Sequence, residues 1–167
     1  MARSSLALWL IAGLLFVAVA GVAIYKVQPL LNPKIASLAS LDRECDLRAG
    51  PCSSELPGGG RITFAIEPLT LPLLKPLQLK VNVEGLVAES VEVDFIGIGM
   101  EMGFNRPALS ASTAGRFSGE GILPVCVRDA MEWEARVLVQ SDRGLVAAPF
   151  RFITVKPGVD LPGSPRQ

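Results

Sequence analysis

A run of apolar residues at positions 6–25 constrains this chain more than any other feature. These 20 residues, LALWLIAGLLFVAVAGVAIY, contain no charged side chain. At a rise of about 1.5 Å per residue, a helix of this length spans the roughly 30 Å hydrocarbon core of a bilayer. Trp9 and Tyr25 lie near its two ends, where interfacial aromatic residues are usually found. The run therefore predicts a transmembrane anchor at 6–25, preceded by a cytoplasmic stub at 1–5.

The alternative for this run is a cleaved signal peptide. Ala18, Val19 and Ala20 fit the small-x-small pattern that precedes a cleavage site. The apolar run, however, continues for five residues beyond Ala20, and Arg3 is the one basic side chain before it. We therefore favour an uncleaved single-pass anchor, with the remainder of the chain exported.

The ionisable residues exclude several kinds of chemistry. The 167 residues include 16 Lys and Arg, 16 Asp and Glu, and no His. A chain without His has no Ser-His or Cys-His nucleophile pair and no His-ligated metal. The balanced charge also lacks the clustered basic excess that is typical of nucleic-acid-binding proteins. We therefore expect neither an enzyme nor a nucleic-acid partner.

Beyond residue 61 the apolar residues follow the two-residue period of β-strands. The clearest alternation covers 61–67, 77–84, 91–95 and 131–139, and a last strand is expected to run to about 155. Weaker strands fit 108–113, 116–120 and 122–127. About seven or eight short strands with one apolar and one polar face predict an all-β fold. We expect an immunoglobulin-like antiparallel β-sandwich at 61–156.

The segments on either side of this domain are expected to be less regular. In the predicted linker at 26–60, Asn32 and Pro33 have the sequence of a helix start. A short helix over about 33–43 is therefore expected, and an irregular linker is the alternative. The tail at 157–167 has no apolar period, so we expect it to be flexible.

Two of the three cysteines lie close together in the linker. Cys45 and Cys52 are separated by six residues that include a Gly-Pro turn. In an oxidising compartment such a pair predicts a local disulfide. A thiol pair that binds a soft metal or exchanges disulfides is one alternative, and pairing that involves Cys126 is another.

An unusual pair of methionines lies in the segment GIGMEMGFNRP at 97–107. Met100 and Met102 are two residues apart, so that on a strand they project from the same face. Thioether and thiolate ligands select Cu(I). Together with Cys126 and Met131, the pair could form a soft metal site that needs no His. Core packing or contact with a partner is the alternative.

The anchor and several segments together resemble bacterial periplasm-facing single-span proteins. These segments are CDLRAGPC, PLQLKVNVEGL, GMEMGFNRPAL and GEGILPVCVRDAMEWEARVLV. The layout is similar to that of the FixH-like and YtkA-like families, which join one membrane anchor to an immunoglobulin-like domain. Those families are associated with the assembly or copper supply of haem–copper cytochrome oxidases. The resemblance implies a single-pass protein of the bacterial inner membrane with its C-terminal domain in the periplasm.

From the residues and this resemblance we expect a membrane-anchored accessory or assembly protein for a respiratory membrane complex. Its partners would be a haem–copper oxidase or the assembly factors of that oxidase, together with the bilayer around 6–25. It would handle Cu(I) through Met100, Met102, Cys126 and Met131. The alternative is a structural single-span subunit or protein-interaction module that binds no metal.

Overall fold

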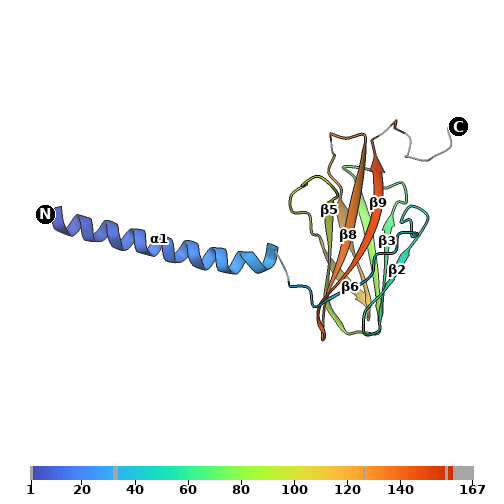
Figure 1. Cartoon of the computed structure of the whole chain (residues 1–167), viewed down its shortest axis with the longest axis horizontal. Helices are drawn as coiled ribbons and strands as arrows, with labels where there is room; N and C mark the ends of the chain where they lie inside the picture. The colour runs from blue at the N-terminus through green and yellow to red at the C-terminus, as the bar shows by residue number, and fades with distance from the viewer. Residues whose placement is uncertain (1, 32–33, 126, 157, 160–167) are drawn as a thin grey trace. The chain divides into compact units, whose positions relative to one another are not determined.

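The chain forms two compact units, Met1–Lys34 and Ile35–Gln167 (Figure 1). The structure is a computed structural model that describes residues 2–31, 34–125, 127–156 and 158–159. The first unit contains helix α1 (Ala2–Leu31), and the second is a β domain. Most of the predicted tail at 157–167 lies outside the described residues, as do Asn32 and Pro33.

Helix α1 has the length and composition needed to cross a membrane. Its most apolar stretch is Leu8–Gln28, and this stretch is not buried inside the protein. Large side chains such as Trp9 and Phe16 are exposed on it. The helix continues past Ala20 without a break. The expected apolar helix is therefore present as a candidate transmembrane anchor.

The described part of the β domain has nine strands, which confirms the all-β prediction. They are β1 (Ser37–Leu38), β2 (Cys52–Glu55), β3 (Arg61–Glu67), β4 (Pro76–Glu84), β5 (Ala88–Gly97), β6 (Ala108–Thr113), β7 (Arg116–Ile122), β8 (Ala130–Ser141) and β9 (Gly144–Val155). They form one curled sheet in the order β1-β9-β8-β5-β6-β7-β4-β3-β2. An immunoglobulin-like sandwich of two separate sheets is not confirmed, because β6 pairs with β5 and also with β7.

Alternation along the strands places the large apolar side chains inside the curl. On β8, the predicted inward residues at 131, 133, 135, 137 and 139 are all buried. The Trp133 indole N–H donates a hydrogen bond to Thr154 Oγ1 at 2.9 Å, so this buried polar group has a partner. Phe95 packs edge-on against Phe152, with ring centroids 6.4 Å apart. The strand pairs thus enclose a continuous core.

The expected helix at 33–43 is wrong for the described residues from 34 onward. The Ala36 and Ala39 N–H groups each donate a hydrogen bond, at 2.8 Å, to the carbonyl oxygens of Leu145 and Ala147 respectively. These bonds make this segment strand β1, which runs parallel to β9. A short helix is marginal in water, whereas the unpaired edge of β9 offers backbone partners. Backbone pairing with β9 therefore decides the structure of this segment, and the helix expected from its local sequence does not form in the described residues.

The weak strand expected at 122–127 is also wrong beyond Ile122, where β7 ends. Residues 123–125 have no regular structure, and Cys126 lies outside the described residues. Pro124 has no N–H group to donate to a strand ladder. The Leu123 carbonyl instead accepts a hydrogen bond from the Leu74 N–H at 2.9 Å. The segment is therefore a loop that is tied to a neighbouring loop.

The connection between β1 and β2 runs from one edge of the sheet to the other. These strands are consecutive in the chain but stand at opposite ends of the strand order. Cys45 and Cys52 form a disulfide in this connection, with Cα atoms 5.8 Å apart, which confirms the local pairing. Leu47 between them is fully buried, and Arg48 donates a hydrogen bond to the Ile153 carbonyl of β9 at 2.7 Å. The disulfide loop therefore packs onto the β domain.

Removal of the disulfide is expected to destabilise the β domain. In the chain-entropy model, a loop of this size contributes about 2–3 kcal/mol to the free energy of unfolding. Cys45→Ala/Cys52→Ala should therefore lose about this amount in a denaturant titration of the full chain. Cys126→Ala is the control, because it leaves the disulfide intact. Equal stability of the double variant and the wild type would contradict this role.

Candidate functional site

Three loops meet at one end of the β domain, which we call the loop end. They are residues 68–75, residues 98–107, and the described residues 123–125 and 127–129. The Leu74–Leu123 backbone bond joins the first loop to the third. The Asn105 side-chain amide donates a hydrogen bond to the Ile122 carbonyl at 2.9 Å and so ties the second loop to the end of β7. In Figure 1 this is the end toward which the arrow of β9 points.

The chain from α1 reaches the β domain at the opposite end, which we call the linker end. Ala36 bonds there to Leu145, beside the turn that joins β8 to β9. Arg143 in this turn donates three hydrogen bonds to loop carbonyls of the linker end. Strand β9 then runs for 12 residues to Val155. At about 3.3 Å per residue, it separates the linker end from the loop end by roughly 40 Å.

The structure brings Met102 and Met131 together at the loop end, beside Gly97. A Cβ atom built on Gly97 would lie 2.6 Å from Met131 Cε and 2.7 Å from Met102 Cγ. The Met100 carbonyl oxygen would lie 2.7 Å from the same point. Met131 is buried, whereas Met100 and Met102 are partly buried and pack against the same core. Of the predicted metal ligands, Cys126 alone lies outside the described residues.

Glycines at 97, 99 and 103 explain this arrangement. Gly97 has no side chain, so the methionine side chains can approach its backbone. Gly99 and Gly103 have φ angles of 73° and 76°, a left-handed conformation that glycine adopts readily and that turns the chain. Met100 and Met102 therefore lie in a loop and not on a strand. Their approach to the core comes from these turns and not from strand alternation.

Large apolar side chains are exposed around the same loops. Leu74, Phe104, Ile122, Val125 and Val127 are 66%, 65%, 50%, 47% and 84% exposed. Leu74 has a φ of 56°, a conformation that costs a residue with a Cβ about 1–2 kcal/mol. The Val127 carbonyl accepts a hydrogen bond from Lys156 Nζ at 2.8 Å. Exposed apolar side chains gathered in this way are typical of an interaction surface.

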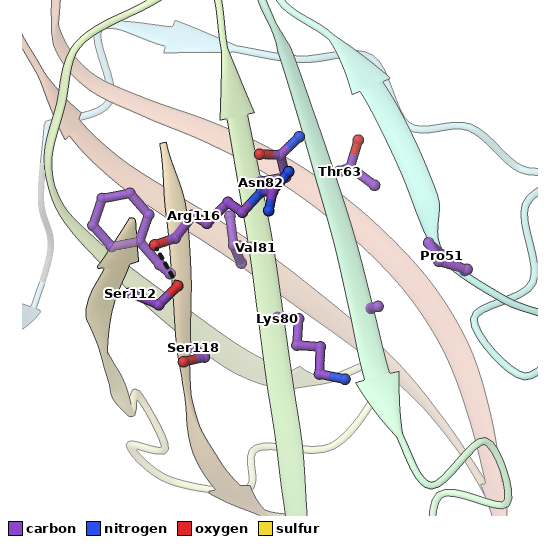
Figure 2. Close-up of a pocket in the computed structure, with 10 residues that line it drawn as sticks. Pro51, Thr63, Lys80, Val81, Asn82, Ser112, Arg116 and Ser118 are labelled. Carbon is purple, nitrogen blue, oxygen red and sulfur yellow. Dashed lines mark hydrogen bonds between the residues drawn. The ribbon is translucent and has the colours of Figure 1, made fainter. Parts of the chain in front are cut away.

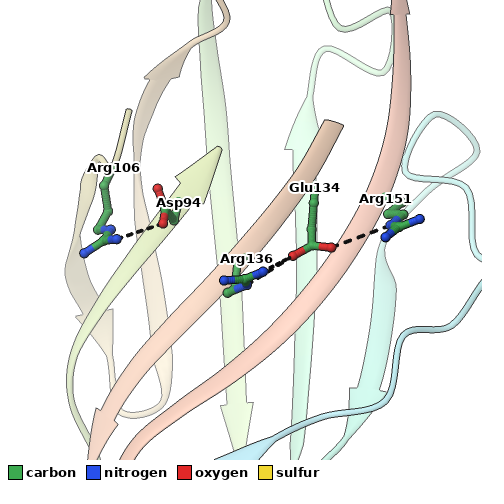
Figure 3. Close-up of polar contacts among 5 residues, drawn as sticks. All are labelled: Asp94, Arg106, Glu134, Arg136 and Arg151. Atoms are coloured by element: carbon green, nitrogen blue, oxygen red, sulfur yellow. Dashed lines mark hydrogen bonds and ion pairs between the residues drawn. The ribbon is translucent and has the colours of Figure 1, made fainter. Parts of the chain in front are cut away.

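A row of charged side chains crosses β5, β8 and β9 on the outward face (Figure 3). Glu134 is buried and lies between two cations, with Arg136 Nη2 at 2.5 Å and Arg151 Nε at 3.6 Å. Asp94 pairs with Arg106 at 2.8 Å, and these side chains are only 14% and 9% exposed. The sequence pattern places these residues on a polar face but contains no signal for their near burial. Each of these charged side chains forms an ion pair with another member of the row, so we assign the row a structural role.

A hollow of about 440 Å³ lies over β3, β4 and β7 (Figure 2). Among the residues around it, Thr63 shares a hydrogen bond with Ser53 at 2.8 Å, and Lys80 pairs with Glu67 at 2.7 Å. On the neighbouring part of this face, the hydrogen bond and charge of Glu55 raise the pKa of the Arg61 guanidinium. These polar groups therefore bind one another, and the loop end is the stronger candidate site.

No protein-family model, curated protein or solved structure matches this chain. The resemblance to FixH-like and YtkA-like proteins therefore stays a prediction. The candidate site depends on its own geometry, which is the convergence of two methionines and the exposure of apolar side chains at the loop end.

Gly97→Ala tests the packing of the methionines. Its added Cβ would lie less than 3.0 Å from Met131, Met102 and the Met100 backbone, so we expect a loss of about 1–3 kcal/mol in unfolding free energy. Gly50→Ala is the matched control, because nothing lies within 4 Å of its added Cβ. That control should change stability by less than about 0.5 kcal/mol. The packing is disproved if the two variants are equally stable in a denaturant titration.

Asp94→Asn tests the nearly buried ion pair. Removal of one partner leaves the Arg106 charge poorly solvated, and we expect a loss of about 3 kcal/mol in unfolding free energy. Glu67→Gln makes the same chemical change in the Lys80–Glu67 pair, whose side chains are about half exposed. That variant should lose less than about 1 kcal/mol. Similar losses of unfolding free energy in the two variants would show that burial does not strengthen the Asp94–Arg106 pair.

Proposed function

We propose that this chain is a membrane-anchored accessory protein whose loop end docks onto a membrane-protein complex. The observation that carries the proposal is the exposure of large apolar side chains on three loops that are tied together. Burial of apolar surface against a partner stabilises a complex by about 25 cal/mol per Å² before the costs of association. Val127, Leu74 and Phe104 are the most exposed of the large apolar side chains at the loop end. Val127 and Phe104 would supply much of the buried surface.

The anchor and the disulfide indicate the cellular compartment in which this docking would take place. Helix α1 would hold the protein in a bilayer, and the Cys45–Cys52 disulfide is typical of an oxidising compartment. In the described residues, the segment at 36–39 pairs with β9 at the linker end, whereas the exposed apolar side chains lie at the loop end. We infer a bacterial inner membrane with the β domain in the periplasm.

We further propose that the partner is a respiratory complex of the haem–copper oxidase type or one of its assembly factors. This part of the proposal rests on the resemblance to FixH-like and YtkA-like proteins. It gives the chain no enzymatic role, in agreement with a sequence that has no His for a Ser-His or Cys-His nucleophile pair. The protein would act by binding and holding its partner.

Site-specific photo-crosslinking in native membranes tests the docking. A photoreactive amino acid at Phe104 should crosslink the full-length chain to a subunit of one membrane complex. The same amino acid at Val87, which is 67% exposed at the linker end, is the matched control and should give little or none of that product. Val127→Glu should remove the Phe104 crosslink, since it places a charge in the interface.

Equal crosslinking from Phe104 and Val87 would contradict the proposal. A Phe104 crosslink that Val127→Glu leaves unchanged would also contradict it. Crosslinks from Phe104 to a membrane complex without oxidase subunits or assembly factors would overturn the respiratory part alone.

A further inference from the structure

We propose that the hollow over β3, β4 and β7 binds a small organic acid, which has one carboxylate group on an apolar body. Arg116 would bind the carboxylate, and the carbon-rich floor of the hollow would contact the apolar body. The inference concerns the outward face of the sheet (Figure 2) and does not rest on docking at the loop end.

The hollow exists because short side chains lie beside a long one. Ala65 of β3 and Ser118 of β7 are both paired with Lys80 of β4. Strand alternation directs all three side chains outward, about 5 Å apart from one strand to the next. Lys80 Nζ lies 2.7 Å from the Glu67 carboxylate, so the lysine extends toward that residue. The space above Ala65 and Ser118 therefore stays open.

Arg116 borders the same space. It is paired with Asn82 of β4, and its backbone carbonyl accepts a hydrogen bond from Ser112 Oγ at 3.2 Å. In Figure 2 the Arg116 side chain extends across β4 toward Asn82. Arg116 is exposed, and within the described part of the chain its guanidinium forms no ion pair. The N–H donors of this guanidinium are therefore available to a ligand.

Four acidic side chains lie on the strands that form this face, and each is already engaged. Each accepts a hydrogen bond from a neighbouring side chain. The pairs are Glu55 with Arg61, Glu67 with Lys80, Glu84 with Asn82, and Glu120 with Gln78. Of the described residues that line the hollow, Lys80 and Arg116 are charged, and both are basic. The hollow thus offers an anion one guanidinium, without a competing carboxylate in its lining.

The lining selects the class of ligand. A guanidinium binds a carboxylate through two parallel hydrogen bonds. Pro51, Ala65 and the methylene stem of Lys80 present carbon to the remainder of the ligand. The volume of about 440 Å³ lies in the range of small-ligand sites, which is about 300–1,000 Å³. One available guanidinium suits one anionic group, whereas a polyanion needs several cations.

Methyl NMR of the full-length chain in nanodiscs tests the site, with hexanoate as the probe. With ¹³C-labelled alanine methyl groups, hexanoate should shift the Ala65 signal in a saturable way, because this residue lines the hollow. The methyl group of Ala130, at the start of β8, is the internal control and should not move. A titration without a saturable shift of Ala65 would overturn the proposal.

Two matched probes separate the charge from the apolar body. Hexanamide has the same apolar body without the charge and should bind roughly fivefold more weakly, which is the effect expected of an exposed ion pair. Acetate has the charge without the chain and should bind at least roughly tenfold more weakly, because burial of about two methylene groups already accounts for this ratio. Equal affinity for hexanoate and either of these probes would overturn the assigned class of ligand.

Arg116→Gln tests the residue that would bind the carboxylate. It should weaken hexanoate binding to the level of hexanamide, roughly fivefold, and leave hexanamide binding unchanged. Arg61→Gln is the matched control, because Arg61 is an exposed arginine of the same face that already pairs with Glu55 at 2.6 Å. This control should bind hexanoate as the wild type does. Wild-type affinity in Arg116→Gln, or an equal loss in Arg61→Gln, would overturn the role of Arg116.

Discussion

The two edges of the curled sheet are the constraint on which the rest of the β domain depends. An unpaired edge exposes backbone donors and acceptors and invites association with other chains. Here β1 pairs with Val146 and Ala147 of β9, and the chain then passes through the disulfide loop to β2, which pairs with the first four residues of β3. Buried Leu47 and the Arg48 bond to β9 attach this connection to the domain. One segment of the chain thus supplies the strand at each end of the sheet.

The curled sheet gives the loop end a base of paired strands. Strands β8 and β9 pair along their whole length. The linker end lies at one end of this pair of strands, and the loop end lies at the other. The loops can then hold features that are unfavourable in isolation, such as the left-handed Leu74 and the exposed Val127. Local strain and exposed apolar surface that persist in this way are typical of functional regions. The docking that we propose therefore falls at the loop end, whereas the disulfide loop contributes to stability.

The strands could be predicted from the sequence where one face of the strand is buried. Alternation identifies β3, β4, β5, β8 and β9, because the inward residues must be apolar. It misses β1 and β2, which are short and depend on backbone pairing with distant strands. The predicted helix at 33–43 is wrong for the same reason, since the edge of β9 is invisible in local sequence.

The candidate site is only partly predictable. The spacing of Met100 and Met102 indicates an unusual segment, but strand alternation is the wrong reason for their convergence. The approach of Met131 depends on the absence of a side chain at Gly97, and the sequence shows this glycine without showing its neighbours. The near burial of Asp94 and Arg106 depends likewise on packing that no local pattern records.

Solvent accessibility in native membranes tests the central claim most directly. A spin label at Val127 reports on the loop end, and a label at Val87 reports on the linker end. The account predicts that the label at 127 loses contact with a water-soluble relaxation agent in native membranes compared with purified protein in nanodiscs, while the label at 87 does not change. Equal accessibility of the label at 127 in both preparations would contradict the docking of the loop end.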